Sequence, residues 1–513
     1  MKRTALGRGL LALALLTAGC SGSGDDTATA DADGPAGSTT TAGDGTGTTS
    51  APERPDGPAA TFGPELTGGN GISLLSAAEV PDAVESGYSE AEYPAAGTAI
   101  GYTGELPTDG RFELTEEGSG DFNTRVLVRR PVDAGDFNGT VVVEWLNVSS
   151  GSDFSPDYTY LAEEILRQGY AWVGVSAQHI GIEGGPVAVP TPAGELTGAG
   201  EGIVNFDPER YGDLSHPGDA FSYDIFTQIG RALRTDDEAN PLGDLAVERL
   251  LAVGESQSAF ALTTYVNGVQ PLTGAFDGFL IHSRGGAAAP LGEPGEGIDI
   301  TATFVGEPTT IRTDLDVPVI TVQTETDVLG ILNSFPSRQE DNDRFRLWEI
   351  AGTAHADAFQ LGAAEAVLEC PQPINRGQQN FVLRAALRHL DSWAQGGEAP
   401  PTADRLGVDE SGDPPVYETD EVGNVTGGVR TPAVDAPVDV LTGLAAPDST
   451  IICLLMGSTA PIPDDRLSGL YASPDAYRSA YEDSADAAIG SGFVLADDRD
   501  ALIADADPER IPG

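Results

Sequence analysis

The chain has 513 residues, of which 27 are Lys or Arg and 80 are Asp or Glu, giving a formal net charge of −53. A chain this acidic lacks the positive surface that a phosphate backbone needs, so we expect no nucleic-acid partner. Apolar residues make up 40% and charged residues only 21%, which excludes a generally disordered protein. Three Cys and five His argue against a disulfide-dense scaffold and a Cys- or His-rich metal centre, and we expect no metal and no cofactor.

The N-terminus has the pattern of a secretion signal. Three basic residues among the first eight are followed by an apolar run over 10–16 that is too short to span a membrane. The sequence Thr-Ala-Gly-Cys then ends at Cys20 and resembles a bacterial lipobox, in which the cysteine carries the lipid. We predict a lipoprotein signal peptide over 1–19 and an extracytoplasmic protein anchored to the bacterial cell membrane through Cys20. Ordinary secretion with cleavage nearby is the alternative.

Residues 20–60 are dominated by Gly, Ser, Thr, Ala and Asp. Such a segment has almost no side chains that could bury surface and so offset the entropy of ordering. We predict a disordered tether between the lipid and a folded body that starts at about Thr61.

From Thr61 onward, apolar strand patterns alternate with amphipathic helical patterns. The predicted strands are 124–131, 140–146, 171–176, 249–253, 278–282, 317–323 and 345–350. The predicted helices are 158–168, 220–233, 258–266 and 375–393. Near-continuous apolar strands between helices are typical of a mostly parallel sheet with helices on both faces, which is an α/β fold.

This alternation extends over residues 61–400, which we predict to be the main domain, with 401–513 as a C-terminal extension packed on it. Two Gly- and Pro-rich segments, 180–218 and 285–315, interrupt the pattern. Long insertions of this kind are commonly lids or binding loops, so we expect both near the functional site and expect them to determine its size.

The sequence Gly254-Glu255-Ser256-Gln257-Ser258 lies between a predicted strand and a predicted helix. This context is typical of a nucleophile elbow, whose sharp turn needs small residues two positions before and after the serine. The helix that follows would favour negative charge developing beside Ser256. We predict Ser256 to be a catalytic nucleophile; an ordinary strand-to-helix turn is the alternative.

A serine nucleophile needs a base, and the base needs an orienting acid. In proteins with this elbow the order along the chain is Ser, acid, His. Asp327 follows the predicted strand 317–323, and His355 follows the predicted strand 345–350 after a short turn. We predict Asp327 as the acid and His355 as the base. Glu325 is an alternative acid.

An oxyanion hole needs two N–H donors. The backbone N–H of Gln257, directly after the nucleophile, is the first candidate. The second is expected in the loop after the strand 140–146, where Asn147 or Val148 stands, although Asn147 could simply cap that turn. His282 ends a predicted strand, and we expect it to line the pocket or to lie in the core.

With Cys20 assigned to the lipid, Cys370 and Cys453 remain as an even pair. Paired cysteines in an oxidising compartment are usually bridged, so we predict a disulfide that holds the C-terminal extension on the main domain. Two buried, unpaired cysteines acting as small apolar residues are the alternative.

The chain resembles a bacterial α/β-hydrolase domain family. The stretches that carry this resemblance are 137–148, 170–178, 254–258, 351–357 and 453–459. It implies an α/β-hydrolase fold from about residue 61 to the end and hydrolysis of carboxylic esters by a serine, and it suggests that Gln178 lines the pocket. We therefore expect a secreted, lipid-anchored serine hydrolase that cleaves a small-molecule ester through an acyl-enzyme. A peptidase or acyltransferase with the same triad, and a non-catalytic surface binding protein, are the alternatives.

Overall fold

The computed structural model describes residues 54–75, 80–191, 194 and 198–512. The predicted signal peptide, Cys20 and the tether as far as residue 53 lie outside the described residues. One compact unit begins at Arg54. Arg54 forms an ion pair with Asp277, so the folded unit starts before the predicted boundary at Thr61.

A nine-stranded sheet with the order β1-β2-β3-β5-β4-β6-β7-β8-β9 forms the centre of this unit. The strands are β1 Thr61–Phe62, β2 Tyr88–Glu105, β3 Glu113–Pro131, β4 Thr140–Trp145, β5 Ala171–Val175, β6 Arg249–Glu255, β7 Gly278–His282, β8 Val319–Thr324 and β9 Phe345–Ile350. Strands β4 to β9 run parallel to one another, whereas β1, β2 and β3 pair antiparallel. The predicted α/β fold with a mostly parallel sheet is therefore confirmed.

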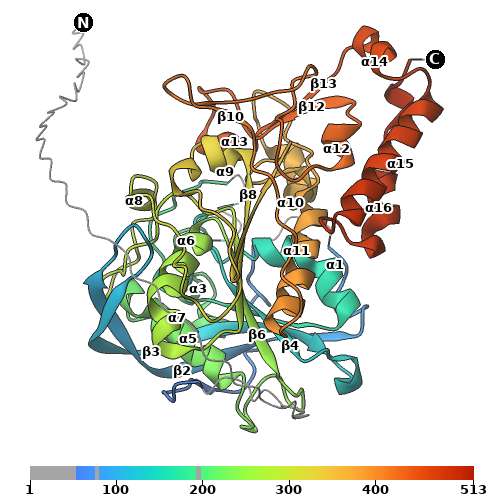
Figure 1. The fold of residues 1–513 in the computed structure, drawn as a ribbon. Helices are drawn as coiled ribbons and strands as arrows, with labels where there is room; N and C mark the ends of the chain where they lie inside the picture. The colour runs from blue at the N-terminus through green and yellow to red at the C-terminus, as the bar shows by residue number, and fades with distance from the viewer. Residues whose placement is uncertain (1–53, 76–79, 192–193, 195–197, 513) are drawn as a thin grey trace, which may run out of the picture. The chain divides into compact units, whose positions relative to one another are not determined.

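Helices cover both faces of the sheet (Figure 1). On one face lie α1 Pro156–Gln168 and α11 Gln379–Ala394, and on the other lie α5 Ser222–Ala232 and α6 Gln257–Thr264. Every side chain of β4 and β5 is buried, which explains why the central strands are continuous apolar runs in the sequence. None of the helices in the described part of the chain is long and apolar enough to cross a membrane.

The connections between these elements contain short helices and turns. They are η1 Ala134–Asp136, α2 His179–Glu183, α3 Ile203–Phe206, α4 Pro208–Tyr211, η3 Asp219–Phe221, η4 Tyr265–Val269, α7 Gln270–Thr273, α8 Ile300–Thr303, α9 Glu325–Leu329, η5 Phe335–Ser337, α10 Ala358–Leu361 and η6 Gly362–Val367. The expected long loop 180–218 thus contains most of α2 and all of α3 and α4, and the loop 285–315 contains α8.

The C-terminal segment, orange to red in Figure 1, adds a further set of elements. They are β10 Val408–Asp409, β11 Val416–Tyr417, α12 Pro432–Asp435, β12 Asp439–Thr442, α13 Ile451–Leu455, β13 Ser458–Pro461, α14 Asp464–Leu470, α15 Pro474–Gly490, η7 Ala496–Asp498, α16 Arg499–Ala504 and η8 Pro508–Arg510. This segment contacts the main body through polar pairs, such as Arg388 of α11 with Asp497 at 2.6 Å. Gln378 Nε2 also donates to the Tyr481 hydroxyl at 2.7 Å.

Candidate active site

Ser256 stands in the sharp turn between β6 and α6. Its backbone has φ 61° and ψ −119°, a conformation that side-chain-bearing residues rarely adopt and that strained functional turns commonly contain. The turn brings residues 254 and 258 so close that a Cβ on Gly254 would lie 2.9 Å from the Cβ of Ser258. The predicted need for small residues on both sides of Ser256 therefore follows from the observed backbone.

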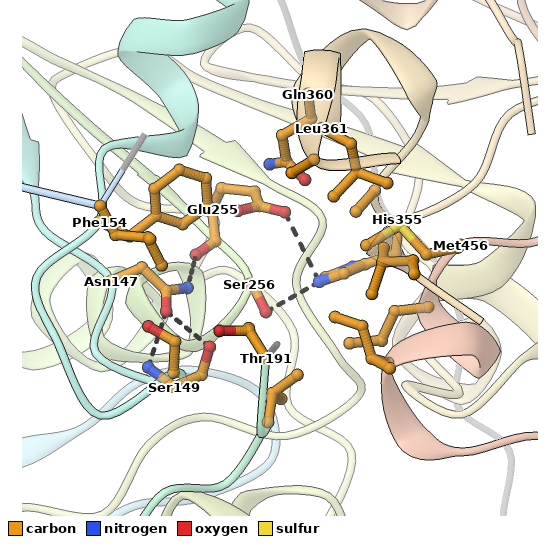
Figure 2. A pocket seen from close by; sticks show the side chains of 18 of the residues that line it. Asn147, Ser149, Phe154, Thr191, Glu255, Ser256, His355, Gln360, Leu361 and Met456 are labelled. Atoms are coloured by element: carbon orange, nitrogen blue, oxygen red, sulfur yellow. Dashed lines mark hydrogen bonds and ion pairs between the residues drawn. The ribbon is translucent and has the colours of Figure 1, made fainter. Parts of the chain in front are cut away.

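His355 lies in the loop after β9 and reaches Ser256. Its Nε2 is 2.8 Å from Ser256 Oγ, and its Nδ1 is 2.7 Å from Asp327 Oδ1 (Figure 2 shows the first of these contacts). The backbone N–H of His355 also donates to Thr326 Oγ1 at 3.1 Å, which ties the loop to α9. The structure thus brings the three predicted residues together in one hydrogen-bonded row.

Asp327 is held in place by donors on its other oxygen. Its Oδ2 accepts hydrogen bonds from the Thr324 N–H at 2.6 Å, the Thr324 hydroxyl at 2.7 Å and the Ser283 hydroxyl at 2.8 Å. The bond from the Thr324 N–H belongs to a capping box at the start of α9, which fixes the turn after β8. These three donors leave Oδ1 to face His355 Nδ1.

Glu325, the alternative acid, faces elsewhere. Its carboxylate oxygens accept the backbone N–H groups of Gly352 at 2.6 Å and Gly443 at 2.9 Å. It therefore joins the loop after β9 to the C-terminal segment, and Asp327 alone occupies the acid position beside His355. The two carboxylates point in different directions because the chain turns into α9 directly after Thr324.

Burial raises the pKa of Glu325 from 4.5 to about 7. The folded state therefore binds a proton that the unfolded state releases, and the free energy of unfolding should fall as pH rises from about 4.5 to 7, by roughly 3 kcal/mol from this group. Urea unfolding of the wild type and of Glu325→Gln at pH 5 and pH 8 measures this. Between pH 5 and pH 8, Glu325→Gln should lose less free energy of unfolding than the wild type. Its amide NH₂ would face a backbone N–H donor, so the variant should be less stable than the wild type at both pH values. An equal pH dependence in the two proteins would contradict the expectation.

The predicted oxyanion donors differ in their availability. The N–H of Gln257 is the first of α6 and has no hydrogen-bond acceptor among the described residues. The N–H of Asn147 donates to Phe154 O at 2.9 Å, so the prediction of Asn147 as a main-chain donor is wrong in this structure. The N–H of Val148 lies 3.3 Å from the side-chain oxygen of Gln257. Gln257 thus offers a free donor, and Val148 shares its N–H with the Gln257 side chain.

Asn147 has a structural role instead. Its side-chain N–H donates to Glu255 O at 3.0 Å, and its side-chain oxygen accepts from the N–H and hydroxyl of Ser149 (Figure 2). These bonds join the loop after β4 to the end of β6, directly before Ser256. Asn147 therefore positions the two segments that border Ser256.

Glu255 was not predicted as a site residue, but its carboxyl group also faces this site. It is 3% exposed and lies 3.5 Å from His355 Nε2 (Figure 2). Burial, and then the nearby carboxylates of Asp157 and Asp327, raise its pKa well above the usual range. Glu255 therefore lies close enough to His355 Nε2 to influence the charge of the imidazole. The only sequence signal was an acid directly before the elbow serine.

Gln178 and His282 do not line the cavity beside Ser256: the prediction of Gln178 as a pocket residue was wrong, whereas His282 lies in the core, which was one of its two expected places. The Gln178 side-chain oxygen accepts from Trp145 Nε1 at 3.0 Å in the core. His282 is fully buried, with its Nδ1 2.9 Å from Asp157 Oδ1. Their core partners, which lie far from them in the sequence, turn both side chains inward.

A cavity of about 140 Å³ opens beside Ser256 and His355. The loop 180–218 contributes Val189 and Thr191 to its lining, whereas the loop 285–315 contributes only to a smaller hollow next to Ser256. Much of the remaining lining comes from residues that the sequence analysis did not associate with the site. These are apolar residues between 356 and 368 and, from α13 and the position after it, Ile452, Leu455 and Met456.

A disulfide joins Cys370 to Cys453, with the two Cα atoms 5.5 Å apart, and confirms the predicted pairing. Cys370 follows η6 closely, and Cys453 lies in α13. The bridge therefore holds the C-terminal segment on the main body, as predicted, and does so at the wall of the cavity.

No curated protein matches the chain. Among solved structures, a fungal esterase from Rhizomucor miehei is 10% identical, with a TM-score of 0.29 over 61% of this chain and 88% of its own. A serine hydrolase without a lid from Xanthomonas campestris is 11% identical, with a TM-score of 0.26 over 50% and 83%. A cold-adapted esterase from an Arctic intertidal metagenomic library is 10% identical, with a TM-score of 0.26 over 54% and 90%.

A match to a protein family covers more of the chain than these structures do. The model of a family described as "Alpha/beta hydrolase domain" matches residues 56–504, which is well over half of the chain. The described fold agrees with that match, because the parallel sheet carries a strand–turn–helix elbow at Ser256 with His355 against it. The chain belongs to the α/β-hydrolase domain family.

Proposed function

We propose that this protein is a serine hydrolase that cleaves carboxylic esters, with Ser256 as nucleophile, His355 as general base and Asp327 as the acid that orients the imidazole. The observation that carries the proposal is the pair of contacts on the His355 ring, 2.8 Å to Ser256 Oγ and 2.7 Å to Asp327 Oδ1. With Nδ1–H donating to Asp327, Nε2 has its lone pair directed at the serine hydroxyl, which is the tautomer that a base requires.

Acylation begins when Ser256 Oγ attacks the ester carbonyl carbon while His355 Nε2 takes the hydroxyl proton. The carbonyl oxygen gains negative charge, which the N–H of Gln257 at the start of α6 is placed to stabilise. Asp327 stabilises the imidazolium that forms. The C–O bond to the leaving group then breaks, and Nε2 returns its proton to the departing alcohol.

Deacylation repeats the sequence with water. His355 Nε2 takes a proton from a water molecule that attacks the acyl-enzyme carbonyl, and the proton then passes to Ser256 Oγ as the acid product leaves. Water and ester are consumed, and an alcohol and a carboxylic acid are released.

Hydrolysis of p-nitrophenyl butyrate by the purified protein, compared with that of a peptide p-nitroanilide, tests the proposal. Faster release of p-nitrophenol than of p-nitroaniline, by orders of magnitude in kcat/KM, is expected. Release from the anilide alone would identify a peptidase, and release from neither would identify a protein that binds without catalysis.

We also propose that the protein is lipidated on Cys20 and lies outside the cytoplasm. The basic start, short apolar run and lipobox-like sequence support this location. The Cys370–Cys453 disulfide also supports it, because such bridges persist mainly in oxidising compartments.

Cys20→Ser should move the protein from the membrane fraction to the soluble fraction. The substitution removes the thiol that carries the diacylglyceryl group, while the remaining apolar run is too short to anchor the chain by itself. Fractionation of expressing bacteria followed by immunoblotting measures this. Equal sedimentation of wild type and variant with the membranes would contradict lipid anchoring.

A further inference from the structure

One wall of the cavity beside Ser256 is apolar and comes from two segments that are far apart in the sequence. The first segment, residues 361–368, contributes Leu361, Ala364, Val367 and Leu368, and the second, residues 452–456, contributes Ile452, Leu455 and Met456. Figure 2 shows Leu361 and Met456 on the same side of the cavity as His355. We call these two segments the apolar wall.

The first segment of the apolar wall has little core of its own. No residue of η6 is buried, and Val367, at its end, is 60% exposed. Leu361 and Leu368 are only partly buried, where they pack with Met456. An apolar surface that borders a cavity next to a nucleophile, and that the protein does not itself cover, is suited to an apolar part of a ligand.

The disulfide is the covalent link between the two segments. Cys370 stands two positions after Leu368, and Cys453 lies between Ile452 and Leu455 in α13. The second segment has further backbone support, because the carbonyl groups of Leu455 and Met456 accept the N–H groups of Ala356 and Asn375. The backbone bonds of η6 and Leu368 stay within residues 357–368, so the disulfide and the packing of Leu361 and Leu368 with Met456 hold them against α13.

From this arrangement we propose that the apolar wall binds an unbranched hydrocarbon chain of the ester, and that the Cys370–Cys453 disulfide sets the preference for chain length by holding the wall together. This inference rests on the proposed function. Burial of one methylene is worth about 0.8 kcal/mol, which corresponds to an increase of about fourfold in kcat/KM for each methylene that the wall covers.

Two series of esters show which side of the ester carries the chain. One series consists of p-nitrophenyl esters from acetate to dodecanoate, and the other of acetate esters from methyl to octyl. We expect kcat/KM to rise about fourfold per added methylene in one series and then level off at the length of the wall. Hydrolysis with a flat profile in both series would overturn the inference but not the proposed function, whereas no hydrolysis in either would overturn the proposed function.

Variants then test whether the preference for chain length depends on the apolar wall and on the disulfide. In the series that shows the rise, the ratio of kcat/KM for the eight-carbon chain to that for the shortest ester should fall about tenfold in Leu368→Asn, where the disulfide stays intact. It should also fall in Cys370→Ser/Cys453→Ser. Leu470→Asn, which removes a half-exposed leucine of α14 away from the cavity, is the matched control and should keep the wild-type ratio.

Because the ratio compares two substrates in one preparation, it does not depend on the fraction of folded enzyme. A wild-type ratio in Leu368→Asn would exclude the wall as the chain site. A reduced ratio in Leu368→Asn with a wild-type ratio in the cysteine variant would overturn the role given to the disulfide.

Discussion

Ser256→Ala should abolish ester hydrolysis while the protein remains folded. The substitution removes the atom that attacks the carbonyl, and water held in its place is a far weaker catalyst, so kcat/KM should fall by roughly 10⁴-fold or more. The side chain is small, and among the described residues its hydroxyl forms one hydrogen bond, with His355 Nε2, so the free energy of unfolding should change by less than about 1 kcal/mol. Steady-state kinetics with p-nitrophenyl butyrate and urea unfolding measure the two effects.

Ser258→Ala is the matched control for this variant. Ser258 stands in the same elbow and is fully buried, and its hydroxyl has no hydrogen-bond partner among the described residues. Alanine also preserves the small side chain that the close approach to Gly254 requires. This control should keep activity within a few-fold of the wild type. A Ser256→Ala protein that retained most of its activity would mean that another residue is the nucleophile.

Asp327→Asn should lower kcat/KM by about 10³- to 10⁴-fold through the tautomer of His355. Three donors, two from Thr324 and one from Ser283, face Oδ2 and would hold the amide oxygen of asparagine at that position. The amide NH₂ would then face Nδ1 of His355, which would have to accept a hydrogen bond. The ring proton would move to Nε2, and the histidine could no longer take the proton of Ser256.

Glu325→Gln is the control for Asp327→Asn because it neutralises a buried carboxylate two positions away that does not contact His355. Its activity per folded molecule should stay within about tenfold of the wild type. The kinetics of both variants are measured with the same ester, and the folded fraction is taken from their unfolding curves. A larger loss in Glu325→Gln than in Asp327→Asn would reverse the assignment of the acid.

The sequence predicts the parallel half of the sheet well and the antiparallel half poorly. Strand β7 has the predicted bounds, because a strand buried on both faces is an almost continuous apolar run. Strand β9 also has the predicted bounds, although Arg346 and Glu349 interrupt its apolar residues. Strand β2, Tyr88–Glu105, was missed. It is rich in Ala and Gly, and its extended form depends on pairing with β3 rather than on its own residues.

The order of Ser256, Asp327 and His355 could be predicted because loops at the carboxyl ends of neighbouring parallel strands meet at one edge of the sheet. Asp327 was predicted as the acid ahead of Glu325, and the structure adds the physical reason for this choice. It depends on the capping box at Thr324, which turns the chain into α9 and points two carboxylates that are two residues apart in different directions.

The apolar wall had no local signal in the sequence. It forms because α13, far along the chain, is linked to the segment after α10 by the disulfide, and such long-range contacts do not appear in periodicity or spacing. The predicted disulfide did connect the two regions, but the sequence does not show that the bridge borders the cavity beside Ser256.

Labelling with a fluorophosphonate probe distinguishes an activated serine from an inert one. The probe forms a covalent bond only with a serine whose proton can be removed by a neighbouring base. Mass spectrometry of the digested wild-type protein should locate one adduct, on Ser256, and the Ser256→Ala protein should stay unlabelled. Folded wild-type protein that stays unlabelled, or an adduct on another residue, would contradict the assignment of Ser256 as the nucleophile.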